Sequence, residues 1–426
     1  MPDMTQESGQ GGQLTRGIER RDVLKGIGAA GVVGLAGCLG DSDVDIGLLM
    51  GVSGPLDELG PPIRDGAEAA LDIINDGDND WELESRFEDT ETDADAGVEG
   101  AEALVDAGAP MYVGALASQV SLRVYENVTE PEGVIQMSPA STAVDFTDNG
   151  MWRTAPSDAF QGAVLAEIAT DHPDHGLGAA TASTLARDDA YGRGLAEEFV
   201  AAFEEHGGEV LTEEILDEEQ DSYEAEIGNA LEGDPDVLFY VDFPEDGQTL
   251  LRNFYESFDE PDLPILVPDG LIDGDLPDLA GQDVETFSNV TGTGPGVADE
   301  LASGLDALRD EIGDTADSVF VRESFDAAAI LSLARVAADS DDPADIEAAI
   351  RDVTEPGGES VNAANLSEGV ELADDGEDIS YEGVSRPIEF DENRDVANPA
   401  YNYFGWTEDE DGNPTTELID LLVLEE

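Results

Sequence analysis

The sequence contains one cysteine, three histidines and only 17 basic residues in a chain of 426. A single cysteine cannot form a disulfide within the chain, and His172, His175 and His206 are too few and too scattered for a histidine-rich metal site. The only lysine, Lys25, lies near the amino terminus, so the remainder of the chain cannot contain a phosphate-binding P-loop. The Gly-x-Ser-x-Gly motif of serine hydrolases is missing as well. These absences lead us to expect no enzymatic activity, no cofactor and no metal ion.

Acidic residues dominate the charge of the chain: 101 of them against 17 basic residues give a formal net charge of -84. With so few cations the chain has no basic surface that could bind nucleic acid. Exposed charges repel one another over roughly 10 Å at 0.1 M ionic strength but over only about 3 Å at 1 M, so the composition predicts a halophilic protein. Intrinsic disorder is disfavoured because 40% of the residues are apolar and they fall in periodic blocks.

The amino-terminal segment has the order of features found in export signals. Arg20-Arg21 and Lys25 precede an uncharged run over 26–37, and small residues stand directly before Cys38. We interpret residues 1–37 as a twin-arginine lipoprotein signal peptide, with cleavage before Cys38 and a lipid on its thiol, followed by a linker over 38–44. The alternative is a membrane-spanning helix, but the apolar run is about half the roughly 20 residues that a bilayer requires. We therefore expect an extracytoplasmic protein anchored to the outer face of the cell membrane.

Strands and helices alternate along the rest of the chain. Short apolar runs over 44–50, 111–113 and 134–137 are separated by segments with helical periodicity. The same pattern restarts after Pro156 and continues to about residue 267. Alternation of this kind predicts α/β architecture with parallel sheets. Because about 390 residues exceed what one hydrophobic core usually supports, we expect two Rossmann-like lobes.

Three of the predicted strands end next to polar residues that suit a small zwitterion. One strand leads to Ser118, the next leads to Ser141 and Thr142, and a third ends before Asp269. In open parallel sheets, ligands collect beyond the carboxyl ends of the strands. Hydroxyls and helix-start amides can donate hydrogen bonds to a carboxylate, and Asp269 can hold an ammonium group. The alternative is that the hydroxyls are helix N-caps and Asp269 is a turn residue.

Short motifs distributed over residues 45–410 resemble the branched-chain amino-acid-binding proteins of ABC transporters, the leucine/isoleucine/valine type. The motifs that carry this resemblance are Val52-Ser53-Gly54-Pro55, Asp65-Gly66-Ala67, Val113-Gly114, Ser138-Pro139-Ala140-Ser141-Thr142, Trp152-Arg153-Thr154-Ala155-Pro156-Ser157-Asp158, Gln161-Gly162, Asp189-Ala190-Tyr191-Gly192, Pro235-Asp236-Val237, Phe325-Asp326-Ala327-Ala328, Phe390-Asp391-Glu392-Asn393-Arg394-Asp395 and Tyr401 to Trp406. Together with the charge and the signal, the chain resembles haloarchaeal lipoproteins of this family. No single motif is specific, but their order and spacing together are.

The resemblance implies a type I periplasmic binding protein, in which the ligand lies in the cleft between two lobes joined by three crossings. The crossings are expected near Ala155, near Phe287 and close to Phe390. The implied segments are 45–155 for the first part of lobe 1, 156–287 for the first part of lobe 2, 288–389 for the second part of lobe 1 with an acidic loop over 354–383, and 390–426 for the end of lobe 2.

The family's ligand contacts can be transferred to this sequence position by position. The resemblance implies that Ser118 and Thr142, with the backbone at Ala140, bind the α-carboxylate, and that Asp269 binds the α-ammonium. The full set of implied ligand contacts is Leu116, Ser118, Ala140, Ser141, Thr142, Tyr191, Phe243 and Asp269. The sequence departs from the family at Leu59, where an aromatic residue is usual nearby, and at Asp269, where glutamate is usual.

The resulting hypothesis is a solute-binding lipoprotein that delivers a small amino acid, in the family's default a branched-chain one, to the permease and ATPase subunits of an ABC importer. Two alternatives of the same fold remain open: a ligand-sensing subunit, and a binder of an amide, urea-like or aromatic acid solute. A secreted hydrolase is a third class, for which we find no residues in the sequence.

Overall fold

The described sheets and helices of the computed structural model lie in the unit Ser42–Glu426. The described residues are 44–146, 150–260, 262–296, 303–397, 399–409 and 412–423. The predicted signal peptide with Lys25, and the predicted lipidation site Cys38, lie outside them. Within the described residues, no helix combines the length and the apolar character that a membrane crossing requires.

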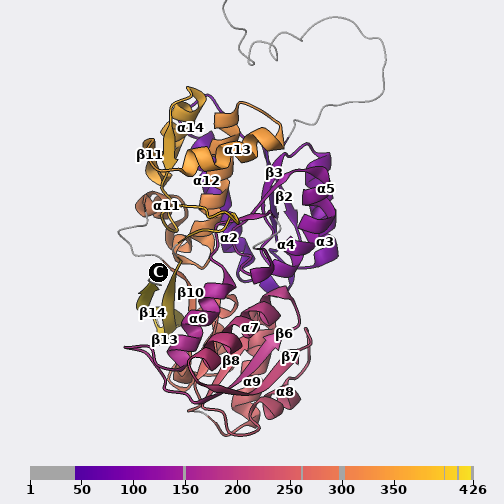
Figure 1. Cartoon of the computed structure of the whole chain (residues 1–426), viewed down its shortest axis with the longest axis vertical. Coiled ribbons are helices and arrows are strands. Elements are labelled where there is room, and N and C mark those ends of the chain that lie inside the picture. Colours follow the sequence, from indigo (N-terminus) through magenta and orange to yellow (C-terminus); the bar gives the residue numbers. More distant parts are fainter. Residues whose placement is uncertain are drawn as a thin grey trace, which may run out of the picture. The chain divides into compact units, whose positions relative to one another are not determined.

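The first sheet, which we call lobe 1 together with its helices, is parallel and has the strand order β2-β1-β3-β4-β5. Its strands β2 and β3 are labelled in Figure 1. Its strands are β1 (Ile46–Met50), β2 (Ser85–Asp89), β3 (Met111–Gly114), β4 (Ile135–Ser138) and β5 (Trp152–Arg153). Its helices are α2 (Gly60–Asn75), α3 (Ala94–Asp106), α4 (Ser118–Val124), α5 (Glu130–Glu132), α11 (Leu305–Ile312), α12 (Val321–Ala338), α13 (Pro343–Thr354) and α14 (Leu366–Asp374). All five residues of β1 are buried, as expected for a strand with both faces covered.

Lobe 2 contains a seven-stranded sheet with the order β14-β13-β10-β9-β8-β6-β7. Its strands are β6 (Thr181–Arg187), β7 (Glu209–Leu216), β8 (Val237–Val241), β9 (Ile265–Val267), β10 (Val290–Gly296), β13 (Ala400–Glu408) and β14 (Pro414–Val423). Its helices are α6 (Asp158–Ala169), α7 (Ala190–Glu205), α8 (Glu224–Ala230), α9 (Pro244–Ser257) and α10 (Leu276–Leu279). The strands β6 to β10 pair in parallel, and β13 pairs antiparallel with both β10 and β14. The predicted α/β architecture with parallel sheets in two lobes is therefore correct.

Short helical turns join these elements. They are η1 (Gly54–Leu56), η2 (Tyr125–Thr129), η3 (Val144–Phe146), η4 (Asp269–Leu271), η5 (Thr286–Asn289), η7 (Gly313–Asp317) and η8 (Ala363–Asn365). The turns η1 and η4 directly follow the ends of β1 and β9, one in each lobe. They therefore place side chains at the carboxyl ends of the parallel strands.

The expected crossing near Phe287 is wrong. Residues Val290–Gly296 form β10, which pairs with β9 on one side and with β13 on the other, so this segment belongs to lobe 2. The next described segment begins at Ser303 and contains α11 of lobe 1. The glycine-rich sequence of β10 lacks the apolar pattern of a strand. Most of its residues are nevertheless buried, because β10 lies between β9 and β13.

The expected acidic loop over 354–383 is also wrong. It contains a parallel pair of strands, β11 (Glu359–Val361) and β12 (Ile379–Tyr381), with η8 and α14 between them. Widely spaced apolar residues, among them Val361, Val370 and Tyr381, are buried and anchor this segment in lobe 1. Because acidic residues separate these apolar residues, their spacing in the sequence did not indicate a strand or a helix. Farther along the chain, Phe390 and Val396 form an isolated antiparallel bridge.

Candidate functional site

A cavity of about 30 Å³ lies between the two lobes. Its wall is formed by Leu56, Leu59, Ile63, Leu116, Ala117, Ser118, Ala140, Tyr191, Phe243, Asp269, Gly270 and Phe320. The lining comes from residues that follow strands in both sheets and from the starts of α2, α7 and α12. Among the described residues that line it, Asp269 is the only charged one. The cavity is therefore apolar, with one acidic pole and a polar edge at Ser118.

A larger, more open hollow of about 560 Å³ lies on lobe 1 around Trp152. Both of its arginines already have partners: Arg394 contacts Glu347, and Arg351 donates to the carbonyl oxygens of Phe390 and Asp391. Its arginines therefore serve the packing of lobe 1, and the cavity between the lobes remains the candidate site.

Ser118 forms the polar edge of the cavity. It is the first residue of α4, and its Oγ accepts hydrogen bonds from the backbone N–H groups of Thr142 and Ala143, each at 3.2 Å. Because Ser118 Oγ accepts both bonds, its own proton can be donated to a ligand. Ala140 lies beside it in the wall. This edge offers hydrogen-bond donors without adding a positive charge.

Thr142 and Ser141 lie behind this edge rather than in the wall. The Thr142 hydroxyl is buried and makes no hydrogen bond of good geometry within the described part of the chain. Ser141 Oγ is 2.7 Å from Ser121 Oγ and donates to the carbonyl oxygen of Leu116 at 3.0 Å. Ser118 and Ala140 therefore line the cavity, whereas Thr142 lies behind them. Ser141 stabilises the loop that contains Leu116 through its hydrogen bond.

Asp269 forms the acidic pole. It is the first residue of η4, directly after β9 and Pro268, and only 2% of its surface is exposed. Its Oδ1 accepts a hydrogen bond of 2.9 Å from the Tyr191 hydroxyl, which in turn accepts 3.1 Å from the Gly270 N–H. Burial raises the pKa of Asp269 to about 6, although these hydrogen bonds oppose the shift. A ligand ammonium would favour the ionised form of this carboxyl group.

A second buried carboxyl group, Asp158, lies near Asp269. It is the first residue of α6, is fully buried, and neither of its oxygens makes a hydrogen bond of good geometry with a described residue. Burial, followed by the charge of Asp269, raises the pKa of Asp158 well above its ordinary value. Sequence reasoning missed this residue because Ser157-Asp158 before a helix is typical of capping. The two acidic groups make this region of lobe 2 favourable for a cation.

Aromatic and aliphatic side chains form the remaining walls. The rings of Tyr191 and Phe243 are stacked, with centroids 5.5 Å apart and planes 7° apart. Leu116 and Leu59 line the cavity from lobe 1. Sequence reasoning missed Phe320, which has a positive φ of 62° at the start of α12. It also missed Leu56 and Ile63, which line the cavity from η1 and α2.

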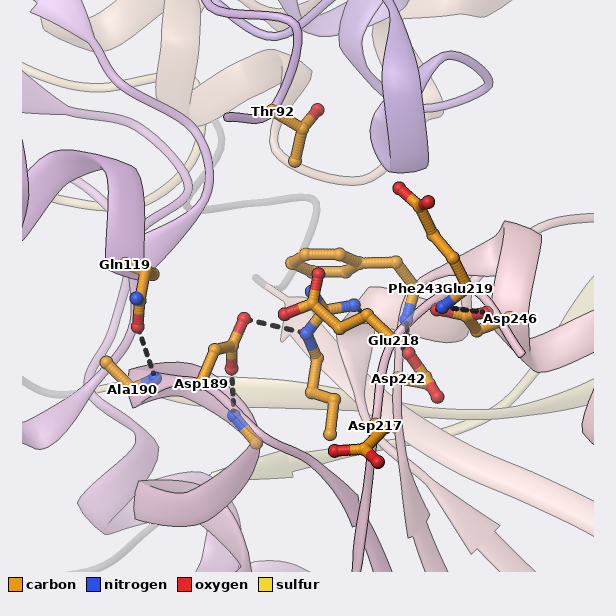
Figure 2. Close-up of polar contacts among 12 residues, drawn as sticks. Thr92, Gln119, Asp189, Ala190, Asp217, Glu218, Glu219, Asp242, Phe243 and Asp246 are labelled. Carbon is orange, nitrogen blue, oxygen red and sulfur yellow. Dashed lines mark hydrogen bonds and ion pairs between the residues drawn. The ribbon is translucent and has the colours of Figure 1, made fainter. Parts of the chain in front are cut away.

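A direct contact joins the lobes beside the cavity (Figure 2). The N–H of Ala190, in the first turn of α7, donates to the side-chain oxygen of Gln119 on α4 at 3.3 Å. Together with the small cavity volume, this contact means that the structure shows the lobes closed over the site. A ligand the size of an amino acid needs more than this cavity volume, which holds about two water molecules. Binding therefore requires the walls to move.

Two α/β lobes, each a mainly parallel sheet, with a cavity where their strand ends meet define the periplasmic binding protein type I fold. The family described as periplasmic binding protein matches residues 43–367, and the chain belongs to that family. It is a solute-binding protein of the kind that serves ABC transporters, not an enzyme.

Similar proteins of known name include Leu/Ile/Val-binding protein homolog 1 of Brucella abortus, 24% identical over 398 residues, which are 92% of this chain and 98% of that protein. BasB of Halobacterium salinarum, a chemotactic signal transduction system substrate-binding protein, is 24% identical over 359 residues, or 81% of this chain and 83% of BasB.

Solved structures with the same fold include the leucine-binding protein LivK of Thermotoga maritima, with a TM-score of 0.71 and 20% identity over 89% of this chain and 98% of LivK. LivJ of Streptococcus pneumoniae in complex with isoleucine has a TM-score of 0.70 and 17% identity over 90% and 99% of the two chains. A Rhodopseudomonas palustris solute-binding protein in complex with 4-hydroxybenzoate has a TM-score of 0.70 and 13% identity over 89% and 96%.

Proposed function

We propose that this protein binds a small amino acid with an aliphatic side chain, in the first place a branched-chain one, in the cavity between its lobes. The observation that carries the proposal is the position of Asp269: a buried carboxyl group at one pole of an otherwise apolar cavity, with the Ser118 hydroxyl at another edge. A zwitterion matches this arrangement, because its ammonium can pair with Asp269 and its carboxylate can accept from Ser118 and the Ala140 backbone. The leucine- and isoleucine-related names of the similar proteins support the same ligand class.

An aromatic acid is the principal competing ligand, since a protein of this fold has been solved with 4-hydroxybenzoate. Such a ligand has a carboxylate but no ammonium. It would be enclosed with Asp269 and next to Asp158, without a basic side chain among the described residues of the cavity wall. Enclosing the carboxylate of the ligand with these two buried acidic groups is strongly unfavourable. The acidic pole therefore favours amino acids over aromatic acids.

The proposed role is delivery of the amino acid to the permease of an ABC importer, whose ATPase drives transport. We place the protein outside the cytoplasm, held at the outer face of the membrane through a lipid on Cys38 after twin-arginine export. This part of the proposal depends on the amino-terminal sequence. A sensing role is the second candidate, because BasB, similar over 81% of this chain, belongs by its name to a chemotactic signal transduction system.

The test is calorimetric titration of the mature protein in molar salt with three matched ligands. L-leucine carries both charged groups, 4-methylpentanoate lacks the ammonium, and 3-methylbutylamine lacks the carboxylate. We expect L-leucine to bind at least about a hundredfold more tightly than either analogue, because each lost group leaves a buried polar partner unpaired. Equal affinity for L-leucine and 4-methylpentanoate would contradict the role of Asp269, and binding of benzoate alone would replace the proposed ligand class.

A further inference from the structure

One buried arginine, Arg187, supports both aromatic residues of the cavity wall in lobe 2, although it does not line the cavity itself. It is the last residue of β6 and only 3% of its surface is exposed. Three carboxylates surround its guanidinium: Nε is 2.7 Å from Asp189, NH1 is 3.1 Å from Asp242, and NH2 is 3.2 Å from Glu218. Figure 2 shows and labels the three carboxylates Asp189, Glu218 and Asp242.

The guanidinium also packs on the ring of Phe243. Its Cζ lies 3.9 Å from the ring centroid, well within the distance at which a cation is attracted to an aromatic face. Phe243 is held at its backbone too, because its N–H donates to Asp242 Oδ1 at 2.9 Å, the same oxygen that accepts from Arg187. The ring is therefore fixed by Arg187 directly and through Asp242.

The second route leads from Arg187 to Tyr191. Asp189 uses one carboxylate oxygen for Arg187 and the other to accept 2.8 Å from the N–H of Gly192, so it caps the start of α7. Tyr191 is in the first turn of that helix and stacks on Phe243. Gly192 also leaves room for the arginine, since a Cβ there would lie 2.4 Å from Arg187 Cγ. Asp189, Tyr191 and Gly192 belong to one sequence motif, which this arrangement explains.

Three carboxyl groups of this cluster share one guanidinium. Burial alone would lower the pKa of Arg187, but the charges of Asp189, Asp242 and Glu218 outweigh it and raise that pKa. Burial raises the pKa of Asp242 to about 7, against the opposing effect of Arg187. Removing the guanidinium would thus leave several buried carboxyl groups without their partner, and lysine could not replace its planar contacts.

We propose that Arg187 is a positioning residue that determines ligand specificity by holding Phe243 and Tyr191 in place as the lobe 2 wall of the cavity. A fixed wall sets the size and shape of the ligand side chain that the closed lobes accept. When the contact between Arg187 and the Phe243 ring is lost, the ring can move, and the cavity admits bulkier side chains at the expense of aliphatic ones. The part of this inference that concerns side-chain selectivity rests on the proposed amino-acid function; the positioning of Phe243 does not.

The test compares Arg187→Lys with Arg193→Lys, a matched control. Arg193 lies on the outer face of α7, pairs with Asp188 and has 48% of its side chain exposed. Residue 243 is replaced by 4-fluorophenylalanine, and its fluorine resonance is recorded without ligand. We expect Arg187→Lys to shift or broaden this resonance and Arg193→Lys to leave it unchanged. An unchanged resonance in Arg187→Lys overturns the proposal.

Selectivity is measured as the ratio of the dissociation constants for L-leucine and L-phenylalanine. We expect Arg187→Lys to move this ratio about tenfold toward L-phenylalanine, the size that a desolvated cation–π contact can provide, and to move it less than about twofold in a Phe243→Leu background. An equal change in both backgrounds overturns the proposal, because Arg187 would then act by a route other than Phe243. If Arg187→Lys does not fold, Glu218→Gln removes one partner of the guanidinium, and a smaller shift of the same sign is expected.

The two hypotheses fail in different ways. If the unmodified protein binds neither L-leucine nor L-phenylalanine, the proposed amino-acid function is wrong, and the fluorine resonance alone decides whether Arg187 positions Phe243. If both amino acids bind and their ratio is the same in Arg187→Lys and Arg193→Lys, the amino-acid function stands and the specificity role of Arg187 is wrong.

Discussion

Arg153 and Asp395, 242 positions apart in the chain, form a two-pronged ion pair: Nε is 2.5 Å and NH2 is 2.8 Å from the two carboxylate oxygens. The third nitrogen, NH1, donates to the carbonyl oxygens of Thr142 and Ala143, each at 2.8 Å. Arg153 ends β5 just before the chain enters lobe 2, and Asp395 precedes β13, where the chain enters lobe 2 for the last time. The pair therefore joins two passages between the lobes to the loop behind Ser118.

We expect Arg153→Met to lower the free energy of unfolding by about 3–5 kcal/mol, because it leaves Asp395 with a buried, unpaired charge. Denaturant unfolding in molar salt measures the effect. Arg193→Met is the control, since it removes an exposed ion pair worth less than about 1 kcal/mol. Equal losses in the two variants would show that the Arg153 pair contributes no more than a surface pair.

We expect Asp269→Asn to abolish binding of L-leucine and, at the same time, to stabilise the ligand-free protein at neutral pH. Burial raises the pKa of Asp269 from its ordinary value to about 6, so folding favours the protonated form of this carboxyl group. The stability that results is fully present below about pH 4 and is lost as the pH rises through 6. Asparagine avoids this loss, which amounts to at most about 3 kcal/mol. Thermal unfolding at pH 4 and at pH 7 measures the difference, which should appear only at pH 7.

Asp326 is the matched control for this pH effect. Burial raises its pKa to about 6 as well, but its carboxylate accepts hydrogen bonds from the Tyr381 hydroxyl and from the N–H groups of Val384 and Ser385. Asparagine has one acceptor oxygen instead of two, so Asp326→Asn should destabilise the protein at pH 7 while leaving leucine affinity within about twofold. Stabilisation by both substitutions would mean that burial alone, not the ligand site, accounts for the Asp269 result.

We expect Gln119→Ala to speed dissociation of L-leucine by about two- to tenfold, although Gln119 does not line the cavity. The substitution removes the hydrogen bond to Ala190 that joins the lobes, and such a bond contributes about 0.5–1.5 kcal/mol. Stopped-flow fluorescence measures the rate. Asn127→Ala, which removes an exposed hydrogen bond within lobe 1, should leave the rate unchanged. A change in the association rate alone would contradict a role for Gln119 in holding the lobes closed.

We expect the melting temperature of the mature protein to rise steeply between 0.1 M and 2 M NaCl. At low salt the net charge of -84 repels itself over about 10 Å, whereas molar salt confines the repulsion to about 3 Å. Potassium chloride should act alike, because screening depends on ionic strength. A rise with one cation only would indicate specific ion binding instead of screening.

Local patterns in the sequence predicted the fold class and the strand ends that meet at the site. Ser118 and Asp269 line the cavity, and each lies shortly after an apolar strand; the carboxyl ends of parallel strands share one edge of a sheet. Asp158 was not predicted as a site residue because Ser157-Asp158 before a helix is typical of capping, and no local signal marks the single basic residue Arg187 as buried.

The sequence by itself determined two α/β lobes with mainly parallel sheets, the absence of disulfides and the strongly acidic character of the chain, because periodicity and composition act over short distances. Only the tertiary structure decided that β10 belongs to lobe 2, that residues 354–383 are folded, and which side chains share the cavity. Those outcomes depend on partners far apart in the chain, such as β10 with β13 and Arg187 with Asp242, and on burial that no local pattern encodes.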